Sequence, residues 1–134
     1  MSRPISVQFP THEDATGRLS VYEAGQSVPF DIKRVFTVTA AAGESGGDHA
    51  HKRCTQLLVC VSGKIRVTCD DGSKVSDFLL DSTRMGLLMP PGIWARQEYL
   101  SEGATLMVLC DRFYEVEDYI RDYHDFEVFC RTGE

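Results

Sequence analysis

His49 and His51 are the two side chains whose type and spacing suggest chemistry. If they lie on a β-strand, both imidazoles point to one face, because strand side chains alternate with a period of two. A neutral imidazole, with an ordinary pKa of about 6.5, can accept and donate a proton near neutral pH. A polar, glycine-rich connection at residues 43–48 precedes the pair. Histidines can also be hydrogen-bonded structural residues beneath a loop, but two on one face favour proton transfer.

Short segments of alternating or β-branched apolar residues recur along most of the 134 residues, enough for one domain with a real core. We expect strands at residues 5–9, 18–22, 33–39, 56–61, 64–69, 74–80, 86–89, 93–99 and 105–110. A hairpin is expected to close near Ser62-Gly63, and Asp70-Asp71-Gly72 predicts a turn before the next strand. Residues 11–17 are polar and turn-like. Many short strands at this spacing predict an all-β fold, a jelly-roll sandwich or barrel forming a single domain over residues 1–134.

One helix is expected near the end of the chain, over residues 114–123. Val116, Tyr119, Ile120 and Tyr123 recur at the spacing of one helical face. Acidic residues stand in the first turn, where the helix dipole favours them. The pattern predicts a short amphipathic helix packed against one end of the barrel.

The overall charge and the cysteines limit the classes to which the protein can belong. With 14 basic and 20 acidic residues the net charge is −6, so no general attraction to nucleic acid is expected. No apolar run approaches the roughly 20 residues that span a bilayer, and the first residues have no secretory pattern. Five cysteines with no C-x-x-C pair favour reduced thiols and the cytoplasm.

A His-x-His pair in a jelly roll indicates a cupin, and many cupins hold a transition metal. Metal cupins usually place a Glu four or five residues after the pair and a further His after a Pro-x-Gly turn. This chain has Thr55 or Gln56 at the first position and Ala95 at the second. Two imidazoles alone leave a divalent site short of ligands. The sequence therefore predicts no metal and no other cofactor, and a metal-dependent oxygenase is the least favoured function.

Several blocks resemble the nucleotide-sugar 3,4-ketoisomerases, the WxcM-like metal-free cupins. They are residues 29–35, 49–52, 56–60 and 106–109, the pair Gly86-Leu87 before Pro90-Pro91, Trp94, and the tail at residues 113–123. The resemblance covers nearly the whole chain. It implies a homodimer with exchanged N-terminal strands that moves the carbonyl of a dTDP-linked 4-keto-6-deoxyhexose from C4 to C3. It also implies a role in deoxyamino-sugar biosynthesis, such as that of O-antigen. His49 would be the base at carbon, and His51 its relay or a hydrogen-bonding partner of the substrate.

The chain departs from this family at three polar positions. Phe36 stands where the family commonly has Tyr, Gly46 where it has Arg, and Ala95-Arg96 where a His or Arg followed by Glu is usual. The expected substrate-binding residues are Arg34, Phe36, Asp48, Trp94 and Arg96. The departures keep two alternatives open: a catalytically silent nucleotide-sugar-binding cupin, and a related nucleotide-sugar epimerase, since enolisation is common to both reactions.

Overall fold

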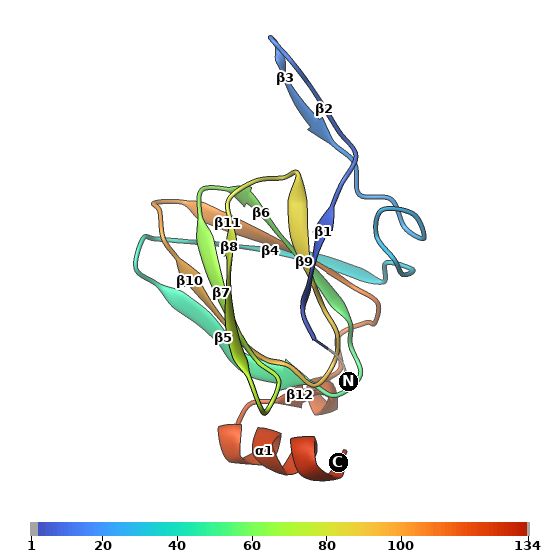
Figure 1. The fold of residues 1–134 in the computed structure, drawn as a ribbon, viewed down its shortest axis with the longest axis vertical. Coiled ribbons are helices and arrows are strands. Elements are labelled where there is room, and N and C mark those ends of the chain that lie inside the picture. Colours follow the sequence, from blue (N-terminus) through green and yellow to red (C-terminus); the bar gives the residue numbers. More distant parts are fainter. Residues whose placement is uncertain (1–2, 134) are drawn as a thin grey trace.

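The computed structural model describes residues 3–133 as two five-stranded sheets that face each other (Figure 1). The first sheet has the order β1 (Ile5–Gln8), β9 (Met85–Met89), β6 (Gln56–Ser62), β11 (Ala104–Cys110), β4 (Arg34–Ala40). The second has the order β12 (Tyr119–Ile120), β5 (Ser45–His51), β10 (Trp94–Tyr99), β7 (Ile65–Asp70), β8 (Val75–Leu80). Neighbouring strands in both sheets are antiparallel. The predicted all-β jelly roll is confirmed, as two facing sheets that hydrogen bonds do not join into one closed cylinder.

The strand β6 shows why this sequence folds into layers. Leu58 and Cys60 on one face join the core between the sheets. Leu57 and Val59 on the other face pack beneath the chain that precedes β4, where Val28 is fully buried. Because both faces are covered, the strand is a continuous apolar run rather than an alternating one.

The predicted hairpin between residues 56–61 and 64–69 is wrong. The strand β6 pairs with β9 and β11, whereas β7 pairs with β8 and β10, so these consecutive strands lie in opposite sheets. The turn at Gly63, with φ of 77°, carries the chain from one sheet to the other. The turn at residues 70–72 is confirmed, because β7 and β8 form a hairpin in which the Asp71 carboxylate accepts backbone hydrogen bonds from Ser73 and Lys74.

The C-terminal helix exists but lies nine residues later than predicted: α1 spans Tyr123–Thr132. The predicted segment instead holds a 3-10 turn η1 (Val116–Asp118) followed by β12. Val116 is 63% exposed, so the apolar stripe that suggested a helix is not a buried face. The helix begins after Asp122, whose carboxylate accepts a hydrogen bond from the backbone of Asp125.

Two segments read as irregular from the sequence contain strands. Residues 11–17, predicted to be a turn, include β2 (Thr11–Asp14), which forms a hairpin with β3 (Gly17–Ser20) that projects away from the sheets (Figure 1). The glycine-rich connection before the histidines is part of β5, which begins at Ser45. Within residues 3–133, no helix has the length and apolar character needed to cross a membrane.

The helix α1 is anchored to the second sheet by Phe126, which is fully buried against Trp94. We expect Phe126→Ala to lower the free energy of unfolding by about 3–5 kcal/mol, because it removes an aromatic ring and leaves a cavity. The same change at Phe113, which is 69% exposed, should have a much smaller effect. Urea unfolding of both variants measures this, and equal losses would show that the helix is not anchored by Phe126.

Candidate active site

The strand β5 presents both histidines to the space between the sheets. Ala50 points the other way and packs against Ile120 and Phe126, so His49 and His51 share the opposite face. Their rings lie 5.2 Å apart between centroids, nearly perpendicular. The predicted common face is therefore confirmed.

A β-bulge precedes this pair. Ala95 pairs with His49 and Arg96 with Gly47, so Asp48 is the extra residue, with φ of 56°. Gly47 has φ of 83°, and a Cβ there would lie 2.6 Å from the Gln97 side chain. Glycine thus permits the close approach of β10, and the bulge reorients the strand just before its first histidine.

A buried carboxylate orients His51. Its Nδ1 lies 2.9 Å from Oδ2 of Asp118, whose Oδ1 accepts a hydrogen bond from the backbone of Arg53 at 2.7 Å. Asp118 is only 3% exposed and His51 7%. Although burial raises the pKa of Asp118, the hydrogen bonds from His51 and Arg53 hold it below its ordinary value. The charged carboxylate requires the proton of His51 on Nδ1, so Nε2 is left as the basic nitrogen.

The surroundings of both histidines favour the neutral imidazole. Burial lowers the pKa of His49, and the nearby charge of protonated His51 lowers it further. Burial also lowers the pKa of His51, against the opposing effect of Asp118. Within residues 3–133, His49 Nδ1 and His51 Nε2 are buried nitrogens without a hydrogen-bond partner. Unpartnered buried nitrogens next to a cavity are suited to contacts with a ligand.

The cavity beside the histidines has a volume of about 350 Å³ and lies between β4, β6 and β11 of one sheet and β5 and β10 of the other. Its wall includes His49, Gln56, Gln97, Phe36 and Leu58. A small recess of about 10 Å³ shares four of its lining residues and reaches His51 and Cys54. His49 therefore borders the open part, and His51 lies at the deep end. A larger cavity of about 670 Å³ lies between β1 and β8 and is lined by neither histidine.

A group of cations and aromatic rings lies next to the histidines. Tyr119 contacts both imidazoles, with ring centroids 5.1 Å from His49 and 4.4 Å from His51. Its hydroxyl accepts a hydrogen bond from Nη2 of Arg34 at 3.4 Å, and the Arg121 guanidinium stacks 4.3 Å from its ring. The positive charges of Arg34 and Arg121 lower the pKa of His51, after burial as the larger cause. These contacts fix Arg34 at the edge of the site.

Four of the five predicted substrate-binding residues do not line the cavity. Asp48 and Arg96 face each other across the outer surface, 3.8 Å apart. Trp94 also points outward and packs edge-to-face on Tyr123 and against Phe126 of α1. On β10 the alternation turns Ala95 inward instead. Among these five only Phe36 lines the cavity, and Arg34 lies behind it in a cation–π contact with the Phe36 ring.

Sequence reasoning missed Asp118, Gln97 and Tyr119. The helix expected over residues 114–123 concealed two of them, because a helix would have spread them over different faces. Gln97 could have been found, since it is two residues beyond Ala95 on the same strand face. Gln56 was noted only as a poor metal ligand, yet it lines both parts of the cavity.

The donor set at the deep end also bears on metal binding. Ligand atoms of His51, Cys54 and Asp118 lie within 4.8 Å of one another. Both oxygens of Asp118 already accept hydrogen bonds, one of them from His51. A metal at this corner would therefore have to displace the contact that orients the imidazole. A metal-free site remains our prediction.

Comparison with known proteins identifies relatives of this chain. The family model described as WxcM-like, C-terminal matches residues 4–131. The TDP-4-oxo-6-deoxy-alpha-D-glucose-3,4-oxoisomerase of Aneurinibacillus thermoaerophilus is 37% identical over 124 residues, covering 92% of this chain and 89% of the relative.

Two solved structures share the fold. A histidine-to-asparagine mutant of the 3,4-ketoisomerase QdtA from Thermoanaerobacterium thermosaccharolyticum, in complex with TDP-4-keto-6-deoxyglucose, aligns with a TM-score of 0.93 and 27% identity over 98% of this chain and 96% of that one. A 3,4-ketoisomerase from Helicobacter canadensis aligns with a TM-score of 0.91 and 29% identity over 96% of this chain and 97% of that one. On these matches the chain belongs to the WxcM-like family.

Proposed function

We propose that this protein is a sugar 3,4-ketoisomerase that moves the carbonyl of a TDP-linked 4-keto-6-deoxyhexose from C4 to C3. The observation that carries the proposal is the pair of imidazoles beside a 350 Å³ cavity, His49 half-buried and His51 buried and oriented by Asp118. The names of the relatives support the same reaction and the same nucleotide. A pathway to deoxyamino sugars, including those of O-antigen, is the corresponding biological role.

The reaction needs two kinds of proton transfer. A base removes the proton from C3, next to the C4 ketone, and the electron pair of that C–H bond forms the C3–C4 double bond. The electron pair of the C4 carbonyl moves to its oxygen, which takes up a proton to give an enediol. A proton returned to C4 and loss of the C3 hydroxyl proton then give the 3-ketone. His49, which borders the open part of the cavity, is placed to handle the carbon protons. His51 Nε2 is placed to relay the oxygen protons, because Asp118 keeps its Nδ1 protonated.

The intermediate carries negative charge on oxygen and needs polar partners in the cavity. The amide of Gln97 lines the wall beside His49 and can donate a hydrogen bond to that oxygen. Arg34 brings positive charge to the edge of the site, and its Nε is buried with no partner among residues 3–133. Preformed donors of this kind stabilise developing charge without reorganising. Phe36 contributes an apolar wall where many relatives of the resembled family have a hydroxyl, so in this chain the donors must come from these other groups.

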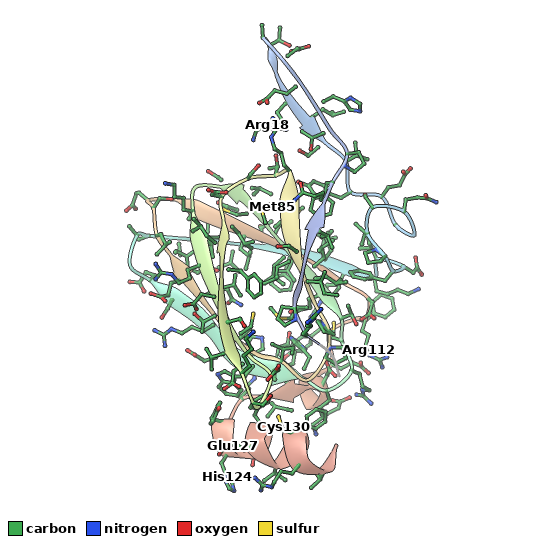
Figure 2. The ribbon with its side chains drawn as sticks, in the orientation of Figure 1. Arg18, Met85, Arg112, His124, Glu127 and Cys130 are labelled. Atoms are coloured by element: carbon green, nitrogen blue, oxygen red, sulfur yellow. The ribbon has the colours of Figure 1, made fainter. Side chains whose placement is uncertain are left out.

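We expect His49→Ala to slow isomerisation about 10²–10⁴-fold, because the variant lacks the base for the C3 proton. The measurement is NMR of TDP-4-keto-6-deoxyglucose in deuterated water, which reports deuterium exchange at C3 and the new ketone. His124, an exposed residue on α1, provides the matched control as His124→Ala (Figure 2). Undiminished exchange in His49→Ala, or binding of the sugar without any turnover by the wild type, would contradict the proposal.

We expect Asp118→Asn to lower kcat about 10–100-fold with little change in KM, because the amide no longer fixes the His51 tautomer. In the wild type the acid limb of the pH–rate profile should lie below the value of an exposed imidazole, since burial lowers the pKa of both histidines. Activity is then lost as the pH falls through that limb.

In Asp118→Asn the limb should move to still lower pH, because Asp118 raises the pKa of His51 in the wild type. A pH–rate profile of each protein measures this. A limb that moves to higher pH, or an Asp118→Asn variant with full activity, would show that the carboxylate does not orient His51.

We also propose that the protein is a cytoplasmic homodimer. The five free cysteines fit a reducing compartment. The projecting β2–β3 hairpin exposes Leu19, and the edge strand β4 exposes Val35 and Val38. Sedimentation velocity should give twice the 15.0 kDa chain mass. Deletion of residues 11–20 should shift the protein toward the monomer, and a wild type that sediments as one chain would contradict the dimer.

A further inference from the structure

Arg34 lacks a carboxylate partner in the part of the chain that the structure describes. Its guanidinium lies 5.4 Å from the ring centroids of both Phe36 and Tyr114 and donates to the Tyr119 hydroxyl. A cation that is partly removed from water is costly unless a negative group balances it. The surroundings of Arg34 therefore call for an anion.

The remaining hydrogen bond of this guanidinium goes to sulfur. Nη2 of Arg34 donates to Sγ of Cys110 at 3.6 Å, and Nε2 of Gln56 donates to the same sulfur at 3.5 Å. Cys110 ends β11 and pairs in register with Arg34 on β4 and with Gln56 on β6. The fully buried sulfur thus lies between the two polar side chains on the flanking strands.

We propose that Cys110 is a positioning residue: its thiolate balances the charge of Arg34, which it holds beside the cavity wall at Phe36, and it holds the Gln56 amide in the wall itself. Its effect on catalysis rests on the proposed isomerase function. A thiolate can only accept hydrogen bonds, so the NH₂ group of Gln56 must face it. The amide oxygen of Gln56, which lines the cavity, is then the atom left for the substrate.

The charged groups around Cys110 favour the thiolate. The neighbouring side chain of Cys54, with the hydrogen bonds from Arg34 and Gln56, lowers the pKa of Cys110 to about 6 even though burial opposes the charge. The contact with Cys110, burial and the charges of Asp111 and Asp118 raise the pKa of Cys54, so the proton stays on Cys54. The pKa values of Cys60, Cys69 and Cys130 are raised.

The first test detects the thiolate in ligand-free protein by its ultraviolet absorbance at about 240 nm during a pH titration. One thiolate should titrate near pH 6 in the wild type and be missing in Cys110→Ala. Arg34→Met and Cys54→Ala should each move the midpoint to higher pH. The matched control is Cys69→Ala, which removes a buried thiol whose pKa is raised to about 12 and should leave the signal unchanged. No thiolate below pH 8 in the wild type would overturn the proposal.

The second test separates charge from packing by kcat and KM for the keto-sugar. We expect Cys110→Ala to lower kcat/KM about 10-fold or more, as loss of charge-assisted hydrogen bonds does. Cys110→Asp keeps a negative charge and should retain more activity than Cys110→Ser, which keeps the size without the charge. Cys69→Ala should stay within about twofold of the wild type.

The ranking of the three Cys110 variants by kcat/KM decides the second test. Equal losses in the Asp, Ser and Ala variants, or a loss that follows their urea stability, would show that Cys110 only fills space. The thiolate titration needs no substrate, so it is decided even if the wild type fails to isomerise keto-sugars. That failure would overturn the proposed function instead.

Discussion

The hydrogen bond between His51 and Asp118 is the interaction on which the site depends. It joins the end of β5 to a segment 67 residues later, and the same carboxylate binds the backbone of Arg53. A buried carboxylate is tolerated only when such donors surround it. One acidic side chain therefore closes the loop after β5, attaches the C-terminal segment to the sheet and selects the basic nitrogen of the imidazole.

Around this contact the protein accepts polar groups that water cannot reach. His49 Nδ1, His51 Nε2 and Arg34 Nε are buried and have no partner within residues 3–133. Each such group costs folding free energy, commonly about 1–3 kcal/mol. A bound ligand that forms hydrogen bonds with these atoms would offset this cost. Without a ligand, the unpaired atoms lower the stability of the fold mainly around the cavity. The surrounding aliphatic core of both sheets supplies the compensating burial.

The sequence predicts well what depends on local alternation. The shared face of His49 and His51, the β7–β8 hairpin and most strand positions follow from period-two patterning and turn residues. Strand pairing between segments that are far apart in the sequence was not predictable in this way. The strands β6 and β7 are adjacent in sequence but lie in different sheets, which local pattern cannot distinguish from a hairpin.

The C-terminal segment shows the same limit at the candidate site. The apolar spacing from Val116 to Tyr123 fits a helix, but pairing of β12 with Ala50 and His51 outweighs that preference. Asp118 and Tyr119 therefore reach the histidines through an extended chain. Trp94 and Arg96 were expected to bind the substrate but lie on the outward face of β10, because Ala95 and Gln97 occupy its inward face.

The crossing of the chain between sheets at Gly63 has a consequence for how the protein folds. The strand β6 can pair only after β9 and β11 have been made, and β4 only after β11, so no two neighbouring strands of the first sheet are consecutive in the chain. Such non-local topologies fold slowly, typically in about milliseconds to seconds. During synthesis His51 is made 67 residues before Asp118, so its imidazole acquires a defined tautomer only after that later segment has been translated.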